Sequence, residues 1–412
     1  MLDIYFEFPY TLGRLRSGPL GNYIDGFAQA LKEKGYTKLT ARRYLRAGAH
    51  FGYFIDLNDI AFSSISKKTL RNFQDHLLDC HCPQSNGGTT QDVRRGAERF
   101  LEYLQTRGFD SLSLNDKNGS DPEIVKSFRI WLVRHKGVSK STEYKYCRGA
   151  LDVVKSLGED VSQYSVQNLR KFILQRSANQ GNGAIKTLVT SLRTFLRYLT
   201  SQNLCPIGLE AAIPAIAKWR HTTLPITLQP TEVRRILDAC NREKLMGIRD
   251  HAIILLLVRL GLRAGDVAKL RLNDIDWKDG SILVCGKSRR QVRLPLPQEV
   301  GDAILKYIEY RQSSEDDIVF LRSVAPYRGF RSGSSLSPIV TRAMRRAGVS
   351  SRRYGAHILR NTVATEMLRE GVSLYEIGAV LRHQSIDMTN HYTRVNTELL
   401  KMVVQPWPEV LL

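Results

Sequence analysis

A basic, helix-forming stretch occurs twice in this sequence, about 100 residues apart, and this repeat constrains the fold more than any other feature. Residues 35–46 (GYTKLTARRYLR) resemble residues 137–148 (GVSKSTEYKYCR). Two further pairs follow in the same order, residues 70–73 with 169–172 and residues 99–104 with 194–199. Two repeats are too few for a solenoid, so the pattern predicts two separate small helical modules. Chance similarity between basic amphipathic helices is the alternative.

Apolar residues recur with helical spacing through the N-terminal part of the chain, after an irregular opening. The predicted helices are Tyr23–Lys34, Thr40–Phe54, Leu70–Leu78 and Arg94–Gln105. A polar, glycine-containing loop, Pro83–Thr90, separates the last two. Residues 115–121, rich in Asn, Asp, Gly and Ser, are the predicted linker to the second module.

In both modules a hydroxyl residue precedes a helix whose first turns are basic. Thr40 has this position in the first module, and Ser141 and Thr142 have it in the second. A helix N-terminus with hydroxyls and basic side chains suits phosphate contact, although an ordinary solvated basic face is the alternative. With two residues from a later linker, the predicted DNA-contacting set is Lys38, Arg42, Arg43, Arg46, Lys140, Lys145, Arg148, Lys218 and Arg220.

The charge of the whole chain also favours a nucleic-acid partner. Lys and Arg total 61 against 40 for Asp and Glu, giving a net charge of +21. Such a surplus is self-repulsive unless a polyanion offsets it, and double-stranded DNA is the expected partner. A merely basic protein without such a partner is the alternative, and charge alone says nothing about enzymatic activity.

Neither a membrane span nor a metal site is predicted. The longest apolar run, Ala252–Val258, is far too short to cross a bilayer, and Met1 is not followed by a signal-like segment. We therefore expect a cytoplasmic protein, associated with the bacterial nucleoid when it is bound to DNA. Among six cysteines only those of Cys80-His81-Cys82 are close, and no second pair has metal-ligand spacing, so reduced thiols are the expectation.

The C-terminal half contains a change of period. After the proline-containing residues 206–228, helices are predicted at Pro230–Cys240 and Asp250–Leu260, the second buried and ended by Gly261. In Leu272–Pro295 the apolar residues then follow the spacing of β-strands, and an Asp-Gly step marks a hairpin turn. This pattern predicts a three-stranded antiparallel sheet. Two further helices are predicted at Glu299–Gln312 and Pro338–Ala347.

Several residues that can act on a phosphodiester lie near the C-terminus. His357 and Arg360 are three residues apart and so are neighbours on one helical face. A capping-box pattern beginning at Ser373 opens the next helix, which leads to His383 and then to Tyr392. Two other tyrosines nearby, Tyr354 and Tyr375, are predicted to be packing or surface residues.

Two cations farther upstream occupy structured positions. Arg263 follows Gly261 at a junction between helices, with Asp266 as a possible partner. Lys287 lies at the turn between the second and third predicted strands. Each alone has an ordinary explanation, since a lone Arg is usually solvated or paired and a Lys on a hairpin is usually surface decoration.

Taken together, these residues resemble the active-site set of the tyrosine recombinases, also called the phage integrase family. The set in chain order is Arg263, Lys287, His357, Arg360, His383 and Tyr392. The local sequences GLRAGDVAKL, HILRNT and LRHQSI resemble the family too. The chain departs from the usual pattern at Asn361, where a second His is common, and at Arg382, where Gly is common and where an Arg could add a phosphate contact or alter packing.

The resemblance implies a mainly α, multidomain protein with two helical SAM-like DNA-binding modules and an integrase-like α+β catalytic domain. The implied parts are a first helical module at 1–114, a linker at 115–121, a core-binding domain at 122–205, a linker at 206–228, a catalytic domain at 229–400 and a tail for subunit exchange at 401–412. The first module, extra to the minimal architecture, would extend the DNA footprint or contact a neighbouring protomer. The apolar tail would dock on an adjacent subunit, with docking on its own subunit as the alternative.

The chemistry fits these residue types. A phenol such as that of Tyr392 can attack a phosphodiester and later leave, and forked Arg donors stabilise the charge that builds on the phosphoryl oxygens. A 3′-phosphotyrosyl link conserves the bond energy, so no cofactor, metal or ATP is expected. By resemblance, Lys287 would protonate the leaving 5′ oxygen, His357 would act as general base, and His383 would hydrogen-bond the phosphoryl group.

The expected activity is therefore site-specific DNA recombination of the integrase or transposase kind, as found in mobile genetic elements. By resemblance the working unit would be a homo-tetramer on two specific DNA sites, with possible accessory proteins or sister recombinases. Two alternatives stay open: strand relaxation of the type IB topoisomerase kind, and a DNA-binding regulator with an inactive site.

Overall fold

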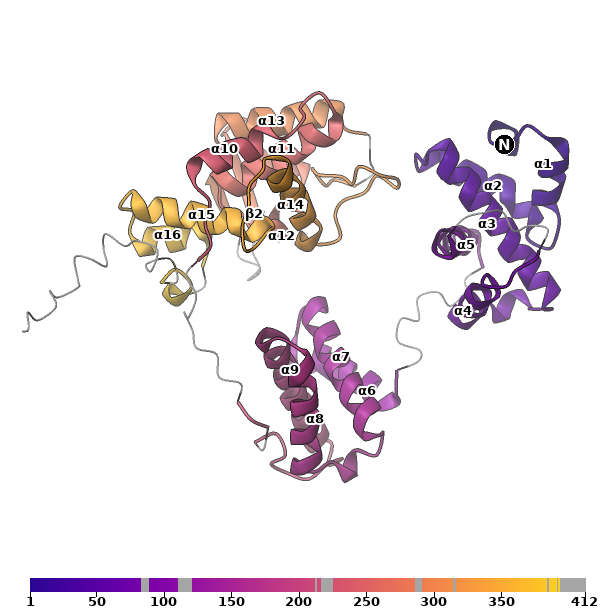
Figure 1. Cartoon of the computed structure of the whole chain (residues 1–412), viewed down its shortest axis with the longest axis horizontal. Coiled ribbons are helices and arrows are strands. Elements are labelled where there is room, and N and C mark those ends of the chain that lie inside the picture. The colour runs from indigo at the N-terminus through magenta and orange to yellow at the C-terminus, as the bar shows by residue number, and fades with distance from the viewer. Residues whose placement is uncertain are drawn as a thin grey trace, which may run out of the picture. The chain divides into compact units, whose positions relative to one another are not determined.

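The computed structural model describes residues 1–82, 89–109, 121–211, 213–215, 225–285, 291–312, 314, 316–383, 385–390 and 392. Within these residues the chain is mainly helical and contains a small antiparallel sheet, which confirms the predicted fold class (Figure 1). None of the described helices combines the length and the apolar character that crossing a bilayer requires.

The N-terminal residues form a group of helices that we call the first bundle. Its elements are η1 (Leu2–Ile4), α1 (Pro9–Arg16), α2 (Gly21–Glu33), α3 (Lys38–Leu57), η2 (Phe62–Ser64), α4 (Lys67–His76) and α5 (Thr90–Gln105). The four predicted helices are confirmed as α2 to α5, with ends displaced by a few residues. The prediction of an irregular opening is wrong, because α1 begins at Pro9. Proline suits the first position of a helix, where the backbone N–H has no partner within the helix.

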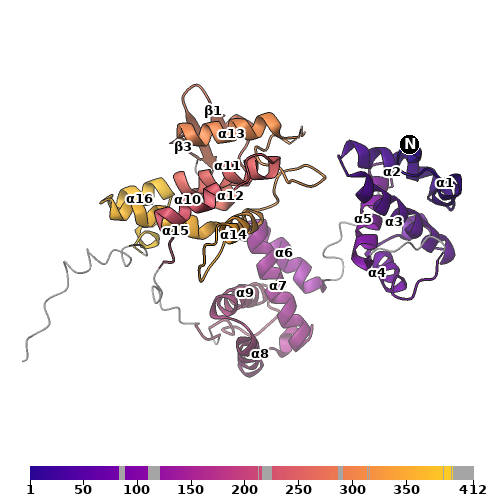
Figure 2. The ribbon, with the colours of Figure 1, turned by 45° about the horizontal axis from the view of Figure 1, so that its top comes forward.

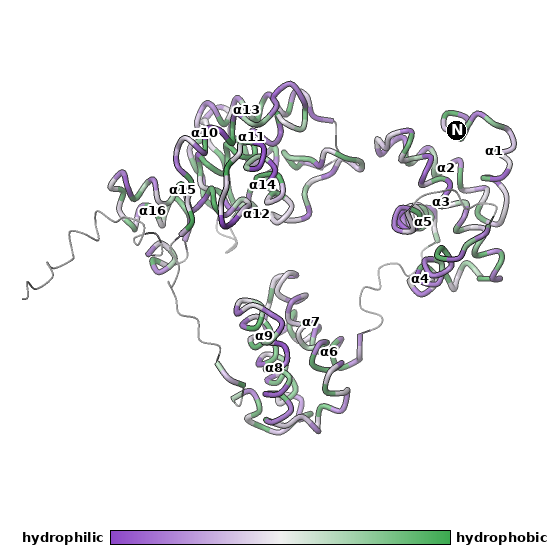
Figure 3. The backbone as a smooth tube through the Cα atoms, in the orientation of Figure 1, coloured by the Kyte–Doolittle hydropathy of each residue, from purple (hydrophilic) through white to green (hydrophobic). Residues whose placement is uncertain are grey.

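Aromatic residues fill the core of the first bundle. Phe27, Phe51, Phe73 and Phe100 are all fully buried. Phe54 on α3 packs its ring against Phe73 on α4, with the ring centroids 5.3 Å apart. Figure 3 shows hydrophobic and hydrophilic residues alternating along these helices, as expected where one helical face is buried and the other is solvated.

The next helices form the second bundle. Its elements are α6 (Glu123–Lys136), α7 (Lys140–Leu157), η3 (Val161–Gln163), α8 (Val166–Asn179) and α9 (Asn182–Ser201). Phe128 is fully buried and contacts Phe195 and Tyr198 at centroid distances of 5.0 and 5.3 Å. This core contains residues of α6, α7, α8 and α9 and none of the first bundle's core residues.

The sequence repeat has the same backbone conformation in both bundles. Gly35 follows the end of α2 with φ +73°, and Gly137 caps α6 with φ +52°. Both glycines are left-handed, a conformation that ends a helix and that L side chains rarely adopt. The two basic helices α3 and α7 therefore begin after equivalent turns.

The caps of these basic helices lie earlier than predicted. The Thr37 hydroxyl accepts a hydrogen bond from the Thr40 backbone N–H at 3.3 Å, and the Ser139 hydroxyl accepts one from Thr142 N–H at 3.3 Å. Thr40, Ser141 and Thr142, expected to precede their helices, lie instead within the first turn. Each helix starts a residue or two sooner because the hydroxyl two positions after the left-handed glycine already satisfies a terminal N–H donor.

The C-terminal region comprises the described residues from 225 onward. Its helices are α10 (Pro230–Asp238), α11 (Leu245–Arg259), α12 (Ala264–Val267), α13 (Gln298–Tyr310), α14 (Ser337–Arg346), α15 (Ala356–Arg369) and α16 (Leu374–Leu381), with the 3₁₀ turns η4 (Leu272–Asp274), η5 (Gly333–Ser335) and η6 (Ile386–Met388). Figures 1 and 2 show α11 among the other helices of this region, and its residues are almost all buried. The predicted buried helix is therefore confirmed, and it forms the centre of the core.

The predicted three-stranded sheet is also confirmed. Its strands are β1 (Ile275–Asp276), β2 (Ser281–Cys285) and β3 (Gln291–Pro295), in the order β1-β2-β3 and all antiparallel. The Asp-Gly step joins β1 to β2, with Gly280 at φ +56°. Ile282 pairs with Ile275 on one side and Leu294 on the other, and it is fully buried in the core of the region.

We predict that replacing the cap Ser139→Ala weakens the first turn of α7 by about 1 kcal/mol, because the Thr142 N–H loses its acceptor. Ser141→Ala is the matched control, two residues on and exposed, and should change local stability by less than about 0.5 kcal/mol. Amide hydrogen exchange of the first turn of α7 measures the difference in the full chain. Equal protection in the two variants would contradict the assignment of the cap.

Candidate active site

Arg360, on α15, is the most deeply buried of the predicted catalytic residues that the structure describes, with 3% of its surface exposed. Its Nη1 donates to the Gly261 carbonyl at 2.6 Å and its Nη2 donates to the Leu381 carbonyl. Leu381 is the last residue of α16, where a helix carries partial negative charge, and Gly261 follows the C-cap of α11. Burial, and then the neighbouring Arg263, lower the pKa of Arg360 to about 10, so the guanidinium stays cationic at neutral pH.

Arg263 lies beside it, at the N-cap of α12. Its Nη2 donates to the backbone carbonyl of Arg382 at 2.8 Å. Burial lowers the pKa of Arg263, and the nearby Asp266 carboxylate partly opposes that effect. The structure thus fixes both guanidiniums against backbone carbonyls, which leaves further donors of each five-donor fork for an anion.

Asp266, a possible partner of Arg263 by sequence, hydrogen-bonds Arg382 instead. Arg382 Nη2 lies 2.7 Å from Asp266 Oδ2, and each side chain is 8% exposed. The guanidinium of Arg382 is therefore committed to an internal carboxylate. The backbone of Arg382 is left-handed at the C-cap of α16, a conformation that glycine usually adopts and that arginine disfavours. The buried ion pair with Asp266 helps to stabilise it.

His383 follows directly and is held from both sides. Its Nδ1 lies 2.8 Å from the hydroxyl of the fully buried Thr389, and its backbone N–H donates to the Gly378 carbonyl. Burial first, then Arg360 and Arg263, lower the pKa of His383 to about 4. The ring is accordingly neutral at neutral pH, with one nitrogen occupied by Thr389.

Tyr392 is buried, with 4% of its surface exposed. Its hydroxyl donates to Asn361 Oδ1 at 3.3 Å, and its ring stacks on His383 with centroids 6.1 Å apart and planes 11° apart. Burial raises the pKa of Tyr392, while Arg360 and Arg263 act in the opposite direction. Asn361 had been given no part in the central chemistry from sequence, yet it is the acceptor that orients this hydroxyl.

His357, on the first turn of α15, is solvent-exposed. Desolvation by the surrounding protein lowers the pKa of His357, and the charges of Arg360, Arg353 and Arg263 lower it further. The neutral ring is therefore favoured. Arg353, which precedes α15, also lines the pocket and is not among the residues predicted from the sequence. No local spacing indicates it, because Arg353 lies before α15 begins at Ala356.

These residues surround one pocket of about 590 Å³. It is lined by Leu262, Arg263, Ala264, Gly265, Gly333, Ser334, Ser337, Arg353, Ala356, His357, Arg360, Asn361, His383, Met388 and Tyr392. Gly333 is required there, because a Cβ on it would lie 2.4 Å from the backbone nitrogen of Gly265. Five of the six predicted catalytic residues thus line a single cavity, although they come from separate stretches of sequence.

Lys287, the sixth, lies outside the described residues, between the end of β2 and the start of β3. Lys218 and Arg220 and the tail at 401–412 also lie outside them. Of the two other tyrosines, Tyr375 is 80% exposed, and Tyr354 packs under the guanidinium of Arg345. These two are surface and packing residues, as predicted.

The predicted DNA-contacting residues on the bundles differ in exposure. Lys38 and Arg43 on α3 are exposed, as are Lys140, Lys145 and Arg148 on α7. Arg42 and Arg46 are half-buried, with both guanidiniums 5.4 Å from the ring centroid of Phe6. These two arginines therefore have an internal contact as well as any external one.

Comparison with known proteins gives concordant results. Residues 227–398 match the model of the phage integrase family. A putative integrase/recombinase, y4rA, of Sinorhizobium fredii is 32% identical over 410 residues, covering 97% of each chain. Tyrosine recombinase XerA of Pyrococcus furiosus is 28% identical over 284 residues, covering 69% of this chain and 93% of that one.

One solved structure with a similar fold is the XerH site-specific recombinase bound to a palindromic difH substrate in a post-cleavage complex. The TM-score is 0.54 with 16% sequence identity, and the match covers 88% of this chain and 95% of that one. At this identity the likeness concerns the fold, and it extends beyond the C-terminal region into the helical part of the chain.

We predict that Arg382→Ala destabilises the C-terminal region by about 3–5 kcal/mol, because it leaves the buried Asp266 carboxylate without its partner. Arg369→Ala, which removes an exposed ion pair with Glu366, is the control and should cost less than about 1 kcal/mol. The double variant Arg382→Ala, Asp266→Asn should recover part of the loss. Thermal melts of these proteins and of the single variant Asp266→Asn measure this, and additive losses would contradict a coupled pair.

His383 should also make stability depend on pH. Its pKa falls from an ordinary 6.5 to about 4 on folding, so the unfolded chain binds more protons between these values. This contribution is complete above pH 6.5 and is lost as pH falls toward 4. His383→Gln should therefore show a smaller drop in melting temperature between pH 7 and pH 5 than the wild type; an equal or larger drop would contradict the assignment.

Proposed function

Because this chain belongs to the phage integrase family, we propose that Tyr392 is its nucleophile. The protein is a site-specific recombinase that cleaves and rejoins DNA. The observation that carries the assignment of roles is the common pocket, which is lined by Tyr392, two guanidiniums held by backbone carbonyls and two histidines. A phosphodiester bound in this pocket would contact the phenol of Tyr392, the two guanidiniums and the neutral histidine rings.

In the cleavage step the Tyr392 oxygen attacks phosphorus, a P–O bond to tyrosine forms, and the P–O bond to the 5′ oxygen breaks. The phenolic proton passes to His357, whose lowered pKa keeps its ring neutral and able to accept. Lys287 gives a proton to the leaving 5′ oxygen, which leaves as a hydroxyl. The products are a 3′-phosphotyrosyl link and a 5′-hydroxyl, and attack by a 5′-hydroxyl reverses the step.

Arg263 and Arg360 stabilise the negative charge of the transition state. Negative charge builds on the non-bridging oxygens as phosphorus is attacked, and donors that are fixed beforehand need no reorganisation then. Hydrogen bonds to backbone carbonyls hold both guanidiniums in place before any DNA arrives. If the Thr389 hydroxyl donates to His383 Nδ1, the neutral ring carries its proton on Nε2 and donates to a phosphoryl oxygen.

The wider assembly extends the same proposal. Exposed basic residues at the starts of α3 and α7 contact DNA phosphates: Lys38, Arg43, Lys140, Lys145 and Arg148. Lys218 and Arg220 contact DNA from the linker, and Arg42 and Arg46 support α3 against Phe6. The working unit is a tetramer joining two specific DNA sites, with the tail at 401–412 exchanged between subunits.

We predict that Tyr392→Phe binds the recombination site with unchanged affinity but forms no covalent adduct on a nicked suicide substrate. The change removes the attacking oxygen and the hydrogen bond to Asn361 while keeping the ring that stacks on His383. Tyr375→Phe, on an exposed tyrosine, is the control and should form the adduct at the wild-type rate. Adduct formation is read by denaturing gel electrophoresis with labelled DNA.

An adduct with the Tyr392→Phe protein would refute the assignment of the nucleophile. Relaxation of a supercoiled plasmid that lacks any recombination site would instead indicate topoisomerase-like activity. Specific DNA binding by the wild type without any adduct would indicate a regulator with an inactive site.

A further inference from the structure

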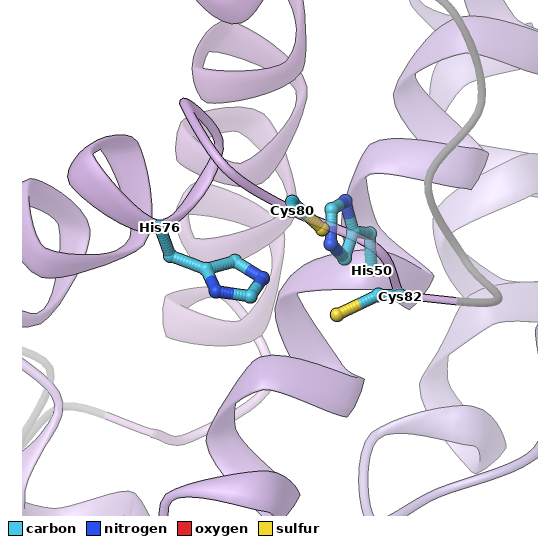
Figure 4. Close-up of side chains that lie close together, drawn as sticks. All are labelled: His50, His76, Cys80 and Cys82. Atoms are coloured by element: carbon cyan, nitrogen blue, oxygen red, sulfur yellow. The ribbon is translucent and has the colours of Figure 1, made fainter.

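The first bundle gathers two histidines and two cysteines at one point, far from the catalytic pocket in sequence. They are His50 on α3, His76 at the end of α4, and Cys80 and Cys82 in the segment that follows. One ligand atom from each residue lies within 4.8 Å of those of the other three. Figure 4 shows the four side chains approaching one another from these three parts of the chain.

The helices bring the two histidines to this point through ordinary packing. His50 and Phe54 are one turn apart on the same face of α3, and Phe73 and His76 are neighbours on the same face of α4. The rings of Phe54 and His76 lie 5.1 Å apart, so the aromatic contact that closes the core also presents His76 toward His50. Neither histidine was noticed in the sequence, because no local spacing links them.

The two cysteines complete the set. Cys80 and Cys82 are present as thiols, and their short segment has no regular secondary structure. The intervening His81 is turned away, since its Nδ1–H donates to the Asp79 carbonyl at 3.0 Å. The sequence interpretation considered His81 together with the cysteines and found no further ligand pair; the fold supplies that pair from α3 and α4.

From these four residues we propose that the first bundle holds a zinc ion. Two thiolates and two imidazoles are the ligands of closed tetrahedral structural zinc sites, with ligand atoms about 3.3–3.8 Å apart. The observed spacing allows this geometry after small side-chain rotations. His50 is 2% exposed, so the ion is screened from water on one side. On binding, two thiol protons are released to solvent and the complex is electrically neutral.

The ion joins α3 to the end of α4 and to the chain that leaves it. It therefore stabilises the bundle that presents the basic start of α3, but it takes no part in the chemistry at Tyr392. The proposal does not rest on the assignment of the catalytic residues, and metal content can be measured without any DNA.

The test is the metal content and cobalt spectrum of the full-length protein. After expression with zinc and extensive dialysis, the wild type should contain one zinc per chain by mass spectrometry. Cobalt added to the chelator-treated wild type should give thiolate-to-cobalt charge transfer and the visible bands of a tetrahedral site. Chelation should lower the melting temperature of the zinc-loaded protein, and added zinc should restore it.

Variants assign the ligands. Cys80→Ser, Cys82→Ser and His76→Ala should each lower zinc affinity at least tenfold, whereas His81→Ala and Cys285→Ser should keep the wild-type content. Circular dichroism of each variant shows whether the helices persist, and the Tyr392→Phe protein should retain its zinc. Wild-type protein that gives no thiolate-to-cobalt band would overturn the proposal, as would a Cys80→Ser, Cys82→Ser double variant with full zinc content.

Discussion

The C-terminal region depends on one buried guanidinium. Arg360 bridges the carbonyls that end α11 and α16 while lying on α15, so three helices meet at a single side chain. A buried charge is tolerated only where hydrogen bonds replace water, and the ends of helices provide acceptors that would otherwise lack partners. The same bonds fix the direction of the remaining donors. Structural and chemical requirements are therefore met by the same residue.

The electrostatics of the pocket follow from that arrangement. Burial lowers the pKa of both guanidiniums; Arg263 lowers that of Arg360 further, and Arg382 lowers that of Arg263. Placing cations together in this way raises the free energy of the DNA-free protein, and under the proposed mechanism the phosphate that binds there offsets this repulsion. Burial first, and then these cations, lower the pKa values of His383 and His357, and the cations oppose the effect of burial on Tyr392. For the two histidines, this shift favours the neutral form that the proposed roles require.

The sequence predicted the elements well because periodicity and capping are local. The Ser373–Glu376 capping box, the buried helix before Gly261 and the Asp-Gly hairpin all occur where the pattern placed them. The candidate catalytic residues came from their order and from a family resemblance, and five of them do share a pocket. The sequence did not predict which residues, far apart along the chain, would contact each other. Asn361 under the Tyr392 hydroxyl and Arg382 on Asp266 are examples, since nothing local indicates either partner.

The two bundles illustrate how a repeated fold can be stabilised differently. In the second bundle the helices equivalent to α3 and α4 are α7 and α8, and an exposed ion pair, Asp152 with Arg176 at 3.9 Å, joins them. Such a pair contributes about 1 kcal/mol at most. The first bundle has His50 at the position of Asp152, and it places His76 one residue before the position that matches Arg176. A coordinated ion there would tie the same pair of helices far more strongly, in the bundle whose connecting segment from α4 to α5 is the longer one.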